Sequence, residues 1–252
     1  MAVATFDFSD HVVLVTGGTK GLGRGIANAF AATGATIAVA ARSTVDDLPP
    51  EWVFAGADLR DGDAAAAMVD LVIEQAGRID CVINNAGGSP PADTATVSPR
   101  FSQRIIELNL LSAMHVSQRA NHHMQVDDGG SIVNIGSVTA LRPAPTVAAY
   151  GAAKAGLLNF TQTAGQEWAP KVRVNSVTPG LIRTEQSELH YGGAETMAMI
   201  ESAIPMHRMA NPSDIASTCM FLASSAAGYL TGANIVVDGG GDIPAFLRNR
   251  DD

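Results

Sequence analysis

Short apolar runs rich in β-branched residues alternate with longer alanine-rich segments along the chain. A short apolar run favours a buried strand, whereas a longer run with helical periodicity favours a helix. Their alternation is typical of a parallel sheet covered by helices on both faces. The sequence therefore predicts a single α/β domain over residues 1–252, a doubly wound Rossmann fold, and the length suits one such sheet.

Glycines, prolines and capping residues between these runs locate the expected elements. We expect strands at Val12–Thr16, Thr36–Ala41, Trp52–Gly56, Cys81–Asn84, Ser131–Ile135, Val172–Val177 and Asn234–Val237. We expect helices at Leu22–Thr33, from the N-cap Asp61 to Gln75, at about Pro99–Met124, at Ala148–Trp168 and from Pro212 onward.

Two segments do not follow this alternation. The stretch at about 183–208 is acidic and contains methionines, which suit adaptable apolar contacts, and we expect it to be a lid over a pocket. An ordinary pair of surface helices is the alternative. The tail 241–252 extends beyond the last expected strand, and it could reach a neighbouring subunit.

The net charge of -9 argues against nucleic-acid partners, because phosphate backbones would meet net repulsion. No run approaches the roughly 18 apolar residues of a membrane span, and the first ten residues lack the basic and apolar regions of a secretion signal. We therefore expect a cytoplasmic protein. Cys81 and Cys219 lie in apolar runs and are expected to be buried, and the six histidines show no metal-ligand spacing.

A glycine-rich turn follows the first expected strand and precedes a helix. Glycine permits a sharp turn and a close backbone approach to phosphates, and the free N–H groups of the following helix favour an anion. This arrangement predicts a dinucleotide site. The candidate residues in the turn are Gly17, Thr19, Lys20, Gly21, Leu22 and Gly23.

The end of the second expected strand indicates which dinucleotide binds. A carboxylate there would bind the adenosine ribose and repel a 2′-phosphate, but the sequence continues into Arg42 and Ser43. An arginine fork beside a hydroxyl suits a phosphate, and Lys20 adds a second cation. The sequence thus favours NADP(H) over NAD(H), unless Arg42 is simply a solvated surface residue.

Tyr150 and Lys154 lie four residues apart, so an expected helix would present them on the same face. A tyrosine with its ordinary pKa near 10 is a weak acid-base group at neutral pH, but a nearby cation stabilises its phenolate. Ser137 ends the preceding strand. These three residues are candidates for proton transfer beside a bound nucleotide.

Taken together, these motifs resemble those of the short-chain dehydrogenase/reductase family, in that family's order and over nearly the whole chain. Residues 16–23 are similar to its T-G-x-x-x-G-x-G turn, 84–87 to its N-N-A-G, and 150–154 to its Y-x-x-x-K. Pro179-Gly180 and the V-D-G-G at 237–240 match later landmarks, and the core is similar to 3-oxoacyl-carrier-protein reductases.

The resemblance implies the sheet order 3-2-1-4-5-6-7 and a role for each matched residue. Tyr150 would be the acid-base, Ser137 would position the reacting oxygen, Lys154 would lower the tyrosine's pKa and bind the nicotinamide ribose, and Asn109 would anchor a water. Further cofactor contacts would come from Asp58, Leu59, Asn85, Ala86, Gly87, Pro179, Gly180, Ile182 and Thr184. The resemblance also implies a homotetramer or dimer packed through the two long helices.

The expected activity is reduction of a ketone or oxidation of a secondary alcohol with NADP(H), with reduction favoured. The substrate stays open among 3-oxoacyl thioesters, small apolar ketones, sugars and steroid-like alcohols. Gly151 replaces a more usual serine, and the loop Gly88-Ser89-Pro90-Pro91 could shape the substrate mouth or be only rigid. A non-catalytic dinucleotide sensor or scaffold on the same fold is the alternative function, and dehydration or isomerisation is another.

Overall fold

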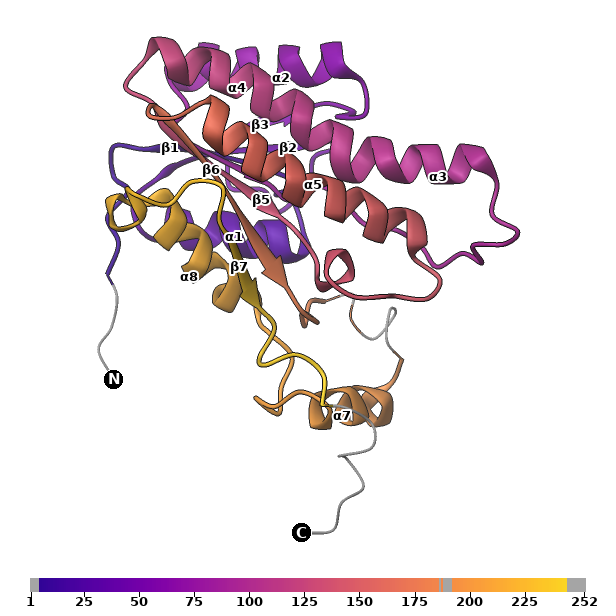
Figure 1. Ribbon diagram of the computed structural model, residues 1–252. Coiled ribbons are helices and arrows are strands. Elements are labelled where there is room, and N and C mark those ends of the chain that lie inside the picture. Colours follow the sequence, from indigo (N-terminus) through magenta and orange to yellow (C-terminus); the bar gives the residue numbers. More distant parts are fainter. Residues whose placement is uncertain (1–4, 186, 188–191, 244–252) are drawn as a thin grey trace.

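The computed structural model describes residues 5–185, 187 and 192–243, and these form a three-layered α/β domain around one parallel sheet (Figure 1). The sheet has seven strands in the order β3-β2-β1-β4-β5-β6-β7, which confirms the predicted fold. The strands are β1 Val12–Thr16, β2 Thr36–Ala41, β3 Val53–Gly56, β4 Cys81–Asn84, β5 Gly130–Ile135, β6 Val172–Pro179 and β7 Asn234–Val237.

Helices cover both faces of the sheet. The α-helices are α1 Gly21–Ala31, α2 Gly62–Ala76, α3 Pro99–Ile106, α4 Ser112–Val126, α5 Ala148–Glu167, α7 Ala194–Ser202 and α8 Pro212–Ala223. Shorter turns are the π-helical η1 Glu107–Leu111 and the 3₁₀ turns η2 Val138–Ala140 and η3 Ser225–Ala227. Helices α1 and α8 pack together on one face, and α2, α4 and α5 cover the other (Figure 1).

Fully buried strands explain why the apolar runs are so regular. All five residues of β1 and all four of β4 are buried, because helices cover them from both sides. Cys81 and Cys219 are buried as predicted, and burial raises the pKa of the Cys81 thiol to about 12. Within the described residues, no helix is both long enough and apolar enough to span a bilayer.

Helix boundaries follow the expected capping chemistry. The Asp61 side chain accepts hydrogen bonds from the N–H groups of Asp63 and Ala64, at 2.9 and 3.1 Å, at the start of α2. Gly77 ends that helix with a φ of 84°, a left-handed conformation that glycine adopts without a Cβ penalty. These residues confirm the predicted N-cap and the predicted glycine after the helix, which ends at Ala76, one residue beyond the predicted Gln75.

One long helix was predicted at Pro99–Met124, and the structure has instead α3, the π-turn η1 and α4 in succession. A π-turn inserts one extra residue into a helix without changing its apolar periodicity greatly, so the sequence pattern did not show it. The turn contains Asn109, which is buried.

The chain order of the strands creates a crevice at one edge of the sheet. The chain runs from β1 outward to β3 and then returns to place β4 on the other side of β1. Loops leaving the carboxyl ends of β1 and β4 therefore diverge, and ligands bind in α/β folds at such a point. Helix α7 lies beyond the carboxyl ends of β6 and β7, below the layers in Figure 1.

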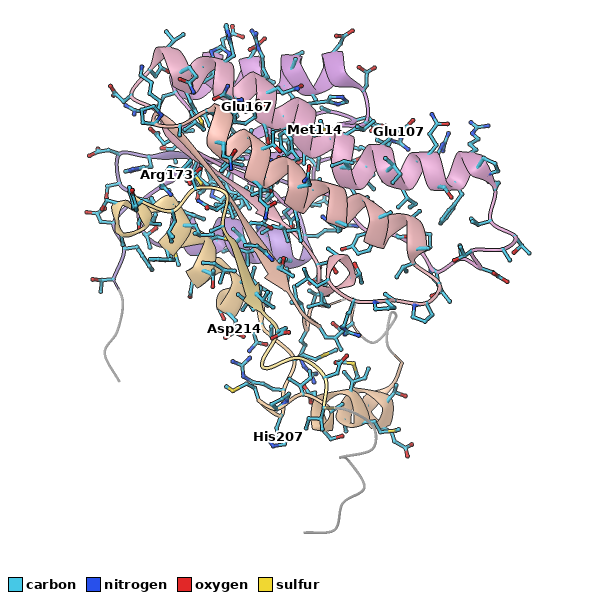
Figure 2. All side chains as sticks on the ribbon, in the orientation of Figure 1. Glu107, Met114, Glu167, Arg173, His207 and Asp214 are labelled. Atoms are coloured by element: carbon cyan, nitrogen blue, oxygen red, sulfur yellow. The ribbon has the colours of Figure 1, made fainter. Side chains whose placement is uncertain are left out.

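At the opposite end of the sheet, an arginine binds the C-terminal end of helix α8. Arg173 in β6 donates to the carbonyl of Leu222, at 2.8 Å, where α8 ends. A guanidinium suits a helix C-terminus because the last carbonyls carry partial negative charge. Arg173 is half-buried near the amino end of β6, and Figure 2 shows it at the other end of the sheet from His207 and α7, so this cation belongs to the framework and not to the crevice.

Candidate active site

The turn after β1 depends on glycines for its shape. Gly17 and Gly21 have φ values of 65° and 56°, in the left-handed region that favours glycine. A Cβ on Gly23 would lie 2.3 Å from the Gly17 carbonyl oxygen, which is closer than atoms can approach. The turn can therefore pack against the first turn of α1 only with these residues.

Thr16, at the end of β1, joins the glycine turn to the loop after β4. Its Oγ1 accepts hydrogen bonds from the main-chain N–H groups of Asn85 and Ala86, both at 3.0 Å. The Asn85 side chain in turn donates to the Thr16 carbonyl at 3.0 Å. One hydroxyl thus holds the two loops of the crevice together.

The first asparagine of the N-N-A-G motif has a framework role. Asn84 donates to Ser117 and to Asn134, both at 2.8 Å, and Asn134 donates to Thr161 at 2.8 Å. These buried amides and hydroxyls connect β4 and β5 to helices α4 and α5. Such a network sets the position of the loop that follows β4.

A hollow of about 440 Å³ lies beside the ends of β1 and β2, and basic residues line it. Lys20, Arg42 and Ser43 all belong to its lining, and so does Asp58 in the loop after β3. The structure therefore brings together the residues that were predicted to contact the adenosine end of the cofactor. The predicted residues in this lining are Gly17, Thr19, Lys20, Arg42, Ser43, Asp58, Leu59, Ala86 and Gly87.

The Asp58 carboxylate in this hollow is paired with Arg60. Arg60 Nε lies 2.9 Å from Asp58 Oδ1, and the two side chains form an ion pair. The Arg60 hydrogen bonds, with a smaller effect of Arg42, lower the pKa of Asp58 to about 2. Sequence reasoning missed Arg60, although its position two residues after Asp58 was a signal that could have been used.

A second hollow, of about 530 Å³, contains the predicted catalytic residues Ser137, Tyr150 and Lys154. Gly87 lines both hollows, so they meet at this residue. The predicted cofactor residues in the second hollow are Leu22, Asn85, Gly87, Tyr150, Lys154, Pro179, Gly180, Ile182 and Thr184. Gly88 and Ser89, from the loop that could shape the substrate mouth, also line this hollow, and the structure adds Val138 and Thr139, which the sequence did not single out.

Lys154 lies at the base of this second hollow and is only 3% exposed. Its Nζ donates to the Ile135 carbonyl at 2.7 Å and lies 5.7 Å from the centre of the Tyr150 ring. Burial lowers the pKa of Lys154 to about 8. Most of the amine is still protonated at neutral pH, so it presents a positive charge to the tyrosine.

Ser137 lies where β5 gives way to η2, and neighbouring groups orient its hydroxyl. Its Oγ accepts hydrogen bonds from the Thr139 N–H at 3.3 Å and from the Thr139 hydroxyl at 3.0 Å. With the oxygen accepting from both, the Ser137 O–H can donate toward the hollow that it lines.

Asn109 lies outside both hollows, behind Gly87. Its side chain accepts from the Gly88 N–H at 2.7 Å and donates to the Gly88 carbonyl at 3.0 Å and the Ile105 carbonyl at 2.9 Å. A Cβ on Gly87 would be 2.5 Å from Asn109 Oδ1. Asn109 thus holds the loop at which the two hollows meet, and its predicted water stays a prediction.

A carboxylate already occupies the position predicted to bind phosphate. The Gly21 N–H, at the start of α1, donates to Glu185 Oε1 at 2.9 Å. Because a carboxylate is an anion, it stands in for the phosphate that a helix N-terminus attracts. This contact supports an anion site at the glycine turn, and the residues around it fit a dinucleotide.

The predicted lid lies partly outside the described residues, which omit 186 and 188–191. Its described part contains α7, and Met197 and Ile204 in it form a small apolar cluster with Met209, which follows the lid. Most of the predicted tail, 244–252, also lies outside the described residues, but the Ile243 N–H donates to the Ala203 carbonyl of the same chain at 2.9 Å. The gating role and any contact with a second subunit stay predictions.

Comparison with known proteins adds to this geometry. A family model described as enoyl-(acyl carrier protein) reductase matches residues 17–242. The chain is 32% identical to 2-dehydro-3-deoxy-D-gluconate 5-dehydrogenase of Escherichia coli, over 95% of this chain and 98% of that protein.

Solved structures agree with the sequence matches. A short-chain type dehydrogenase/reductase from Mycobacterium ulcerans has a TM-score of 0.85 and 32% identity, covering 93% of this chain and 90% of that one. The aldohexose dehydrogenase of Thermoplasma acidophilum has a TM-score of 0.86 and 31% identity, covering 92% and 95%. Both likenesses extend over nearly the whole chain.

Proposed function

The chain belongs to the short-chain dehydrogenase/reductase family, an oxidoreductase family, and on this premise we propose that it is an NADP(H)-dependent enzyme that reduces a ketone or oxidises a secondary alcohol. One observation carries the proposal. The buried ammonium of Lys154 lies close to the Tyr150 ring in a hollow that also contains Ser137 and meets the basic hollow at Gly87.

The protein's own side chains carry out the proton transfer. In reduction, Tyr150 donates its phenolic proton to the carbonyl oxygen, and in oxidation it accepts a proton from the alcohol. The Lys154 charge stabilises the phenolate that forms, and the Ser137 hydroxyl donates to the same substrate oxygen as negative charge develops on it. Tyr150, Lys154, Ile182 and Thr184 would hold a nicotinamide in this hollow, and such a group would supply or accept the hydride.

The proposed preference for NADP(H) is supported by the charges around the first hollow. Arg42 and Lys20 can pair with a 2′-phosphate, and Ser43 can donate a hydrogen bond to it. Asp58 would repel that phosphate, but its ion pair with Arg60 offsets the negative charge. The balance of this hollow therefore favours the phosphorylated cofactor.

Relatives suggest what kind of carbonyl compound to test. The E. coli relative is named for a sugar-acid derivative, and the T. acidophilum relative is named for aldohexoses. We propose a small-molecule alcohol or ketone as substrate and reduction as the favoured direction. An assembly of two or four copies through the long helices α3 to α5 belongs to the same proposal, and light scattering of the purified protein measures it.

The decisive experiment compares wild type with Tyr150→Phe in NADPH consumption over a panel of ketones, keto acids and one enoyl thioester. Loss of the phenolic proton should lower kcat by about 100-fold or more. Equal turnover of a ketone by the two proteins would refute the assigned chemistry, and reduction of the enoyl thioester alone would redirect it to carbon–carbon double bonds.

Cofactor preference needs a separate measurement. Arg42→Ala should weaken NADPH binding by about 10-fold or more, because a charge-assisted hydrogen bond is lost, and should leave NADH binding nearly constant. Fluorescence titration of both nucleotides measures this. An equal loss for both would remove the argument for NADP(H).

A further inference from the structure

The hollow that contains Tyr150 has a charge balance opposite to that of the chain. Arg142 and Lys154 are the charged side chains among its described lining residues, and both are cations. The whole chain has 25 acidic residues against 16 lysines and arginines. The net negative charge of the chain repels an anionic ligand at long range. Within this hollow the lining charges are positive, so they attract an anion at short range.

The two cations differ in what they can contact. Lys154 is buried and already donates to the Ile135 carbonyl, in the position expected of a group that acts on Tyr150. Arg142 lies on the loop after η2, and its side chain is 48% exposed. A substrate entering the hollow can therefore reach Arg142 without disturbing the proton-transfer groups.

The Arg142 guanidinium forms an ion pair with Asp242, which lines a neighbouring hollow. Arg142 Nη2 lies 2.7 Å from Asp242 Oδ2, in the segment that follows β7. A much smaller hollow, of about 10 Å³, shares Arg142 with the larger one and also contains Asp238 and Asp242. The acids near Arg142 thus lie in a hollow other than the one that contains Tyr150.

An arginine held in this way can still bind a second carboxylate. Guanidinium has five N–H donors in a planar fork, and the ion pair with Asp242 involves one of its terminal nitrogens. A fixed fork loses little freedom when it binds, and carboxylates match it with two parallel hydrogen bonds. The Asp242 contact orients the group and also competes for its charge.

We propose that Arg142 binds a carboxylate of the substrate, so that the reacting ketone or alcohol belongs to a keto acid or hydroxy acid. This inference rests on the proposed oxidoreductase function. The hollow's volume of about 530 Å³ suits a small acid beside the nicotinamide end of a nucleotide. Ser89 and Thr139 also line it and supply hydroxyl groups for a polar substrate.

Binding and turnover are measured with matched acids and neutral compounds. The acids are acetoacetate, levulinate and D-gluconate, and their neutral counterparts are methyl acetoacetate, methyl levulinate and D-glucitol. Calorimetry with the NADP⁺-saturated protein gives affinities, and NADPH absorbance gives turnover. Wild type, Arg142→Gln and Asp242→Asn are compared.

Arg142→Gln should weaken binding of at least one acid by about 10- to 100-fold and leave its neutral counterpart unchanged, because a charge-assisted pair is lost. Asp242→Asn should keep or tighten acid binding, because it removes the competing carboxylate. If Arg142 served only to tether the segment after β7, Asp242→Asn would cause the same loss as Arg142→Gln, and that result would overturn the proposal.

The outcomes separate this site from the proposed redox function. Acid binding that depends on Arg142 without turnover of any compound would leave the site standing and refute the redox function. Turnover of neutral compounds alone would support the redox function and refute the carboxylate site. If no acid in the panel shows binding that depends on Arg142, the inference is wrong.

Discussion

Burial of the Lys154 ammonium predicts a specific dependence of stability on pH. Its pKa is lowered from an ordinary 10.5 to about 8, and burial is the cause. Below pH 8 both the native and the unfolded chain carry the proton, so the cost of the buried charge is constant. Between pH 8 and 10.5 the native state has lost the proton and the unfolded state has kept it, so stability rises with pH.

The magnitude follows from the size of the pKa shift. Each pH unit inside that window is worth about 1.4 kcal/mol, so wild type should gain about 2 kcal/mol between pH 8 and 9.5 from this one group. Lys154→Met lacks the titrating amine and cannot show this gain. The variant also leaves the Ile135 carbonyl without its partner, but that cost does not depend on pH.

The assay is chemical unfolding of the cofactor-free protein at pH 7, 8, 9 and 9.5, with wild type and variant compared at each pH. The free energy of unfolding of wild type minus that of Lys154→Met should be nearly flat from pH 7 to 8 and then rise. Lys171→Met is the matched control, because Lys171 also donates to main-chain carbonyls, at 2.8 and 3.0 Å, but is exposed. A difference that stays constant across the range, or that equals the control's, would refute the reasoning.

Three further predictions concern the crevice. Glu185→Gln should tighten NADPH binding by about 2- to 10-fold in fluorescence titration, because the competing charge at the start of α1 is removed, and unchanged affinity would show that the carboxylate does not compete. Gly87→Ala should lower the melting temperature and weaken nucleotide binding, since its Cβ would lie 2.5 Å from Asn109 Oδ1. Arg60→Ala should weaken NADPH binding more than NADH binding, because it leaves the Asp58 carboxylate unpaired and able to repel a 2′-phosphate. Adding Asp58→Asn should restore NADPH binding, and failure of that rescue would contradict the charge argument.

Local sequence determined most of the framework of this protein. Strands β1, β2, β4 and β7 begin and end where the apolar runs predicted, and Asp61 and Gly77 bound α2 through their own capping chemistry. These features depend on interactions between residues close in the chain, or on burial that any covered strand requires. Motif order also predicted the sheet order, through resemblance to a known family.

Only the tertiary structure decided how the candidate site is assembled. The burial that shifts the Lys154 pKa, the meeting of two hollows at Gly87 and the contact of Glu185 with the glycine turn all join residues far apart in sequence. The pairing of Arg142 with Asp242 likewise spans 100 positions, which no local pattern encodes. Side-chain type gives a residue its chemistry, but the charge, desolvation and orientation that select among its uses come from neighbours that the folded sheet brings together.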